Sequence, residues 1–166
     1  FFIVMSILQS FLLIFLLAGM ALGDTYKIKK AAMGMVYIVE GDYENNDKTP
    51  KITIHAKTGG KIPVEVTLLG DGITQISVKE GPETKHTVVT NIKGYSKGSH
   101  VKLMFIAHNE GQMSIVRDQF TKEDTSVIII LLPSVPFFSL GRIVTNNLAN
   151  VHFNQTLHSQ TLGPSG

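Results

Sequence analysis

The stretch Lys51–Lys79 reads KITIHAKTGGKIPVEVTLLGDGITQISVK and contains three short segments separated by glycine-rich turns. In each segment apolar residues occupy every second position, as Ile52 and Ile54 do in the first and Val64 and Val66 in the second. A period of two is typical of a β-strand that buries one face and exposes the other. Gly59-Gly60 and Gly70-Asp71-Gly72 supply residues that favour tight turns. The stretch therefore predicts three consecutive antiparallel strands.

The same pattern extends in both directions along the chain. No connection is long enough for the crossover that parallel strands need, so neighbouring strands are expected to be antiparallel. We predict an all-β, antiparallel β-sandwich of about eight strands between residues 35 and 132. The expected strands are Met35–Glu40, Lys51–Ala56, Ile62–Leu69, Ile73–Lys79, Lys85–Ile92, Val101–Ala107, Met113–Phe120 and Val127–Leu132.

Charge is distributed unevenly over the 166 residues. Charged residues make up 17% of the chain and hydrophobic residues 43%, but residues 1–23 carry no charge and 133–166 carry only Arg142. The body, 24–132, has the charge content of an ordinary soluble domain. The net charge of +2, with basic and acidic residues interleaved, does not favour a nucleic-acid partner. The chain is thus divided into a leader (1–23), an N-terminal extension (24–34), the sandwich (35–132) and a tail (133–166).

The leader is predicted to be a cleaved signal peptide. Its apolar run Phe11–Ala18 has the length of a signal core, and small residues follow up to Gly23. No basic residue precedes the run, and either Phe1 or Met5 could be the start. A transmembrane anchor is the alternative. Secretion is the expected outcome, with no disulfide support because the chain has no Cys.

The tail is rich in polar residues and shows little periodicity, so we expect it to be poorly ordered beyond Phe138. It contains the N-glycosylation sequon that begins at Asn154.

One motif suggests enzymatic chemistry. Gly94–Gly98 fits the G-x-S-x-G pattern of α/β-hydrolases, with Ser96 as the nucleophile. Acids and histidines follow in the hydrolase order, namely Asp118 or Asp124 and then His152 or His158. However, a strand rather than a helix is predicted after Ser96, and no oxyanion-hole segment precedes it. A turn is therefore the favoured interpretation, and we predict that the protein is not an enzyme.

Metal and cofactor sites are not indicated by the sequence. The six histidines do not pair at metal-ligand spacings, and there is no Cys. Asp71 could contribute to a calcium site at one end of the sandwich, although a role as an ordinary turn residue is the favoured interpretation. No glycine-rich loop opens a helix, so no phosphate site and no cofactor are expected.

Three segments resemble the PLAT (lipoxygenase homology) domain, nearest to the C-terminal domain of secreted triglyceride lipases. They are KITIHAKTGGKIPVEVTLLGDGIT, GYSKGSHVKLMFIAHNEG and QMSIVRDQFTKEDTSVIII, within residues 50–132. The Trp often found before the seventh strand of the family is absent here. The resemblance implies an eight-stranded sandwich that docks onto a lipid surface or a partner protein without catalysis.

The contact cluster expected for such docking comes from one loop and the strand after it, and consists of Lys93, Tyr95, Lys97, His100 and Lys102. Basic side chains there would steer the domain toward anionic head groups. Two alternatives remain at this point: an immunoglobulin-like structural or interaction module, and a small hydrolase using Ser96. The ligand, the partner and the oligomeric state do not follow from the sequence.

Overall fold

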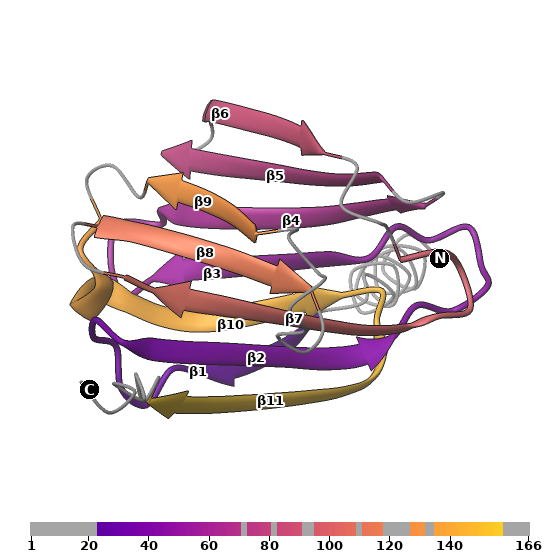
Figure 1. Cartoon of the computed structure of the whole chain (residues 1–166), viewed down its shortest axis with the longest axis horizontal. Helices are drawn as coiled ribbons and strands as arrows, with labels where there is room; N and C mark the ends of the chain where they lie inside the picture. Colours follow the sequence, from indigo (N-terminus) through magenta and orange to yellow (C-terminus); the bar gives the residue numbers. More distant parts are fainter. Residues whose placement is uncertain are drawn as a thin grey trace, which may run out of the picture.

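The computed structural model describes residues 23–70, 73–80, 83–90, 95–108, 111–117, 127–131 and 135–157. These residues form two antiparallel β-sheets and one short 3-10 helix, Phe137–Ser139 (Figure 1). None of the helical structure among them is long and apolar enough to span a bilayer. The strands are β1 (Asp24–Lys27), β2 (Met35–Asp42), β3 (Lys51–Ala56), β4 (Ile62–Gly70), β5 (Ile73–Glu80), β6 (Glu83–Thr90), β7 (His100–Ala107), β8 (Gln112–Arg117), β9 (Val127–Leu131), β10 (Leu140–Asn146) and β11 (Ala149–Leu157).

The two sheets differ in size. The larger has six strands in the order β1-β10-β3-β4-β5-β6, and the smaller has five in the order β11-β2-β7-β8-β9. All neighbouring strands are antiparallel. In Figure 1 the five-stranded sheet lies in front of the six-stranded sheet. The prediction of an antiparallel all-β sandwich is confirmed, and each of the eight expected strands is present as one of β2–β9, with ends shifted by three residues at most.

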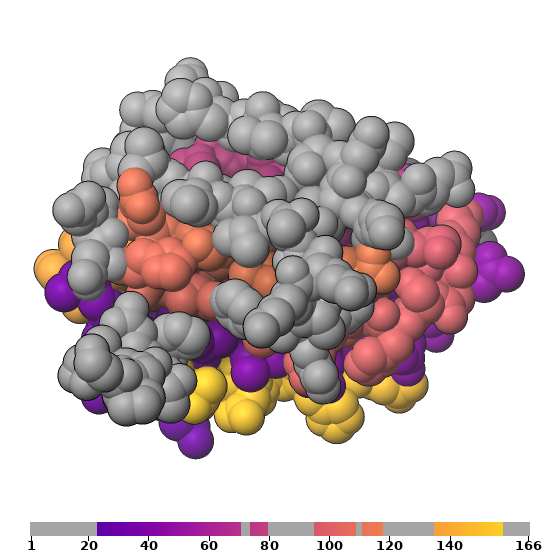
Figure 2. Space-filling model, in the orientation of Figure 1, coloured from indigo at the N-terminus to yellow at the C-terminus, as the bar shows by residue number. Residues whose placement is uncertain are grey.

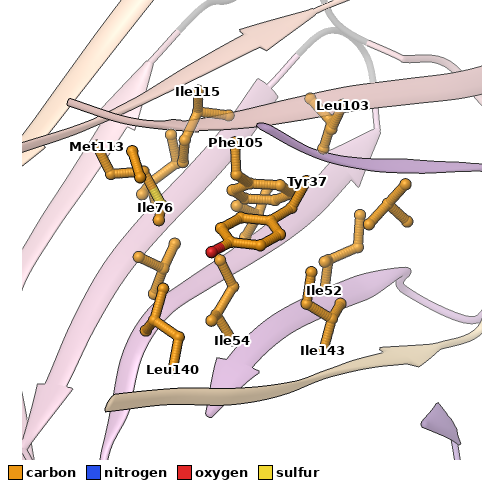
Figure 3. Packing of buried hydrophobic residues seen from close by; sticks show 14 of the residues in the cluster. Tyr37, Ile52, Ile54, Ile76, Leu103, Phe105, Met113, Ile115, Leu140 and Ile143 are labelled. Atoms are coloured by element: carbon orange, nitrogen blue, oxygen red, sulfur yellow. The ribbon is translucent and has the colours of Figure 1, made fainter. Parts of the chain in front are cut away.

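The core lies between the sheets and is built from their inward-facing side chains (Figure 3). Tyr37 and Phe105, from the five-stranded sheet, are fully buried against Ile52 and Ile54 from the six-stranded sheet. The Tyr37 hydroxyl donates to the Lys30 carbonyl oxygen at 3.3 Å, so its polar end is satisfied. Alternation along each strand thus accounts for which residues enter the core.

The ends of the chain correct the predicted domain boundaries. The tail was expected to be poorly ordered beyond Phe138, but β10 and β11 lie within it, and β1 lies within the presumed N-terminal extension. β10 is hydrogen-bonded between β1 and β3, and β11 extends the other sheet beside β2. Asn147, with φ of 58°, turns the chain between these strands, and Asn150, with φ of 49°, lies at the register shift near the start of β11. The sandwich therefore runs from β1 to β11. The predicted signal segment lies outside the described residues except for Gly23.

The outer faces of the two sheets have different chemistry. On the five-stranded sheet, Val36, Ile106 and Val116 form a small apolar cluster with Ile38 and Met104. Figure 2 shows this side of the molecule, with residues of β7 and β8 in orange and those of β11 in yellow. The outer face of β1, β10, β3, β4 and β5 is turned away from the viewer and carries mostly polar and charged side chains, among them Arg142, Glu65 and Lys79. That difference singles out the six-stranded sheet as the candidate binding surface.

Candidate functional site: the polar face of the six-stranded sheet

The register of the six-stranded sheet aligns polar side chains on its outer face. In β3, Ile52 and Ile54 point into the core, so Thr53 points outward. Thr53 is the register partner of Glu65 in β4, and Glu65 is the partner of Ser77 in β5. Register partners share a face in antiparallel sheets. We call these three residues the polar row.

The side chains of the polar row are almost fully buried. Thr53, Glu65 and Ser77 are 5%, 7% and 2% exposed. Burying polar atoms is costly unless they are hydrogen-bonded. The Thr53 hydroxyl donates to the Val144 carbonyl oxygen at 3.4 Å and lies 3.0 Å from Nε2 of His55. The row is therefore fixed by its neighbours.

Glu65 is held between two lysines. Nζ of Lys79 lies 3.0 Å from Oε1 and 3.1 Å from Oε2, and Nζ of Lys51 lies 3.7 Å from Oε1. The side chains of Lys79 and Lys51 are 25% and 40% exposed, compared with 9% for Glu65. The carboxylate oxygens can accept further hydrogen bonds, and the two ammonium groups can donate them. The cluster thus presents fixed charged acceptors and donors, with one positive charge in excess.

His55 lies on the same face as the polar row. Burial lowers the pKa of its imidazole, the positive charge of Arg142 lowers it further, and Glu65 acts in the opposite direction. The ring is therefore neutral at pH 7, with one nitrogen as donor and the other as acceptor. A neutral histidine beside a threonine adds another hydrogen-bonding group without adding charge.

A hollow lies on each side of the polar row. One, of about 310 Å³, is lined by Thr25, Lys27, Lys57, Gly141 and Arg142. The other, of about 480 Å³, is lined by Thr49, Lys51, Thr67, Asn146 and Asn147. Because Asn146, Lys51 and Thr67 are register partners two positions from the row, the second hollow shares its face. The row and the two hollows together form one extended polar surface, which we call the polar face.

The contact cluster predicted from the sequence lies elsewhere, at the start of β7. Lys93 is outside the described residues. Tyr95 is buried, its hydroxyl is hydrogen-bonded to the backbone of Lys102, and the Arg117 guanidinium lies 4.7 Å from its ring centroid. Tyr95 is thus part of the packing rather than an exposed side chain. The contact role of the cluster as a whole stays a prediction.

The charged members of that cluster have acidic partners. Lys97 lies 3.4 Å from Asp47, and Lys102 lies 2.7 Å from Glu40. His100 contacts Asp42 at 2.9 Å. Hydrogen bonding to Asp42 raises the pKa of His100, while bonds from Asn150 and then His100 lower the pKa of Asp42. These pairings reduce the net positive charge that the sequence suggested for this region.

The remaining predicted residues are dispersed. Asp71 lies outside the described residues, and within them no group of three or more acidic or histidine side chains could hold a metal ion. Asn154 is exposed on β11, so its glycosylation stays a prediction. Ser96 lies in an exposed turn before β7, where its carbonyl oxygen accepts hydrogen bonds from Ser99. His152 is on β11, whereas Asp118, Asp124 and His158 are outside the described part of the chain.

Comparison with known proteins identifies the fold. The sequence matches no protein-family model and no curated protein sequence. Among solved structures, chicken galectin 2 is similar with a TM-score of 0.67 and 9% identity, over 82% of this chain and 100% of that chain. Toad ovary galectin in complex with thio-digalactose gives 0.64 and 11%, over 81% and 99%. Sheep galectin-11 in complex with glycerol gives 0.59 and 13%, over 82% and 100%.

These similarities correct the resemblance to the PLAT domain, which was wrong. Alternating strands and glycine turns are common to many sandwiches, whereas the order of strands within the sheets distinguishes them. That order depends on pairings such as β1 with β10, which are distant in sequence and were not predicted. The chain has the β-sandwich fold of the galectins.

Proposed function

We propose that the protein is a non-catalytic carbohydrate-binding module that holds a glycan on its polar face. The observation that carries the proposal is the polar row, in which Glu65 is fixed by Lys51 and Lys79 beside Thr53 and Ser77. Sugar hydroxyls both donate and accept hydrogen bonds, so a preorganised set of charged acceptors and donors suits them. The galectin-like fold supports the proposal, since one toad galectin of this fold was solved with thio-digalactose and also with N-acetylgalactose.

Glycans attached to secreted proteins or to membranes would then be the partners. Secretion, which the apolar leader predicts, would bring the module to such glycans. Direct docking to lipid through Lys97, His100 and Lys102 has less support, because each of these side chains is paired with an acidic group. Electrostatic attraction to anionic lipid needs unpaired positive charge.

The test compares two carboxylates that have similar local partners on opposite sheets. Glu65→Gln removes the charge on the polar face, and Glu40→Gln removes a lysine-paired charge on the outer face of the five-stranded sheet. A charged hydrogen bond contributes about 1.5–3 kcal/mol, so Glu65→Gln should weaken glycan binding about 10- to 100-fold. Glu40→Gln should leave it unchanged. Galactosides and a glycan array provide the ligands, and isothermal titration calorimetry gives the affinities. Absence of binding to any glycan, or equal losses in both variants, contradicts the proposal.

A further inference from the structure

Three cations meet at one end of the polar face, around the hollow of about 310 Å³. Lys27 in β1 is the register partner of Arg142 in β10, and the two therefore point to the same side of the sheet. Arg142 is in turn the partner of His55 in β3, two positions from Thr53 in the polar row. The third cation, Lys57, follows β3 directly. The hollow is thus a continuation of the polar face.

A β-bulge holds Lys57 at this hollow. The register between β10 and β3 shifts between Leu140 and Arg142, which leaves Gly141 as the extra residue. A Cβ on Gly141 would lie 2.9 Å from Cα and 3.0 Å from the backbone nitrogen of Lys57, closer than side chains are normally accommodated. The Lys57 amide donates to the Ser139 carbonyl oxygen at 2.7 Å, and its Nζ donates to the Phe138 carbonyl oxygen at 2.7 Å. Lys57 is therefore fixed by backbone contacts that a larger residue at 141 would disturb.

Within the described part of the chain, no ion pair balances the positive charge of this hollow. No carboxylate of the described residues forms an ion pair with Lys27, Lys57 or Arg142, in contrast to the lysines beside Glu65. Like charges placed opposite each other on neighbouring strands destabilise a sheet. The effect of Arg142 on the pKa of His55 shows that its charge is felt across this face. Such an arrangement costs stability when the hollow is empty, and an anion would relieve the repulsion.

We propose that this hollow binds an acidic substituent, a sulfate or a carboxylate, of the glycan held on the polar face. The inference rests on the proposed carbohydrate-binding function and names the class of glycan. Arginine is well suited to such groups because its planar guanidinium can form two parallel hydrogen bonds to one anion. The hollow on the other side of the row has a single lysine, Lys51, and neutral Thr and Asn side chains, and it suits a neutral sugar.

The spacing of the two hollows fits an oligosaccharide. Lys51 lines the larger hollow, and His55 is the register partner of Arg142, which lines the smaller one. These two β3 residues are four positions apart, which corresponds to about 13 Å along a strand. That distance exceeds one pyranose ring. A ligand that reaches both hollows therefore has more than one sugar unit, with its neutral part near Asn146 and its acidic group near Arg142.

The experiment compares matched ligands on the purified protein. Lactose, its 3′-sulfated form and its 3′-sialylated form share a disaccharide and differ in the acidic group, and inorganic sulfate serves as a fourth probe. Calorimetry at about 50 and 200 mM salt should give at least tenfold tighter binding of one or both acidic forms than of lactose at low salt, and a smaller preference at high salt. The sulfated and sialylated arms distinguish a sulfate site from a carboxylate site.

Variants at the hollow show which residues cause the preference for acidic ligands. Lys27→Gln and Arg142→Gln should each reduce the ratio of acidic to neutral affinity at least threefold, and together abolish the preference for the acidic forms. Lys30→Gln, an exposed lysine in the connection between the sheets, is the matched control and should leave the ratio unchanged. Circular dichroism verifies that each variant is folded.

Other outcomes separate the two proposals. Lactose binding without any preference for the acidic forms, or a preference that survives in the double variant, overturns this inference and leaves the carbohydrate-binding function intact. Binding of inorganic sulfate at this hollow with no saccharide preference also overturns it. Absence of binding to every saccharide contradicts the proposed function itself.

Discussion

Replacing Ile143 by alanine tests whether the C-terminal part of the chain belongs to the core. Ile143 lies in β10, is 0% exposed and belongs to the main core cluster together with Ile54. The substitution removes three carbon groups, which at about 0.8 kcal/mol each corresponds to roughly 2.4 kcal/mol of lost burial. The cavity left behind raises the expected loss to about 2–5 kcal/mol. That is a large fraction of the roughly 5–15 kcal/mol by which domains are stable.

The neighbouring Val144 provides the control. It lies on the opposite face of the same strand and is only partly buried, so Val144→Ala should cost less than about 1 kcal/mol. Urea unfolding followed by circular dichroism measures both changes, because the chain has no Trp and only four Tyr for fluorescence. Equal losses in the two variants, or a loss below about 0.5 kcal/mol for Ile143→Ala, would refute the placement of β10 in the core.

Three further predictions concern charges and close packing. Lys27→Gln should raise the unfolding temperature slightly at low salt, because it removes the repulsion between Lys27 and Arg142; the gain in stability is at most ~1 kcal/mol. Thermal unfolding at low and high salt measures this change, and a lower unfolding temperature would contradict it. Gly141→Ala should destabilise the fold by about 1–3 kcal/mol, because the added methyl group would meet the backbone of Lys57. Unchanged stability in urea unfolding would disprove the close approach of Gly141 to Lys57. In the His100–Asp42 pair, the pKa of His100 is raised, so its contribution to stability is lost as the pH rises through that pKa. The pKa of Asp42 is lowered, so its contribution to stability is lost as the pH falls through that pKa. His100→Gln should therefore lower the unfolding temperature between about pH 4 and 6.5 and have little effect at pH 8; a deficit that is independent of pH would count against the pair.

The strands with regular alternation could be predicted from sequence because the cause of the pattern is local. In β3, Ile52 and Ile54 face the core while Lys51 and Thr53 face outward. The alternation of apolar and polar residues in the sequence therefore shows directly which side of the strand is buried. The turns beside such strands are also visible, because glycine is needed at positions such as Gly59 and Gly70, which have φ of 78° and 81°.

The strands at the ends of the chain could not be predicted in the same way. In β10 the bulge at Gly141 interrupts the alternation between Leu140 and Ile143, so the period of two is lost. β11 lies at the edge of its sheet and packs on the core only through partly buried residues such as Val151 and Phe153. A weakly hydrophobic edge strand has the composition of a loop, which explains why this region was expected to be poorly ordered.

The candidate site required information that no single strand contains. Thr53, Glu65 and Ser77 each occupy an ordinary outward position, and only the register of three strands brings them into one row. His55 occupies an outward position of β3, and its neighbours Arg142 and Glu65 come from strands whose pairing is set by the complete fold. The predicted contact cluster, by contrast, relied on residues adjacent in sequence, and the structure pairs its charges with partners from the loop after β2 and from β2 itself.

Nuclear magnetic resonance can show directly whether a glycan binds to the polar face. The isotopically labelled protein is titrated with 3′-sulfated lactose and with lactose, and the backbone amide shifts are followed. We expect the largest shift changes in β3, β4, β5 and β10, around Thr53, Glu65, Ser77 and Arg142. Shift changes concentrated instead in β7 and β8, on the outer face of the five-stranded sheet, would contradict the assignment of the polar face as the binding surface.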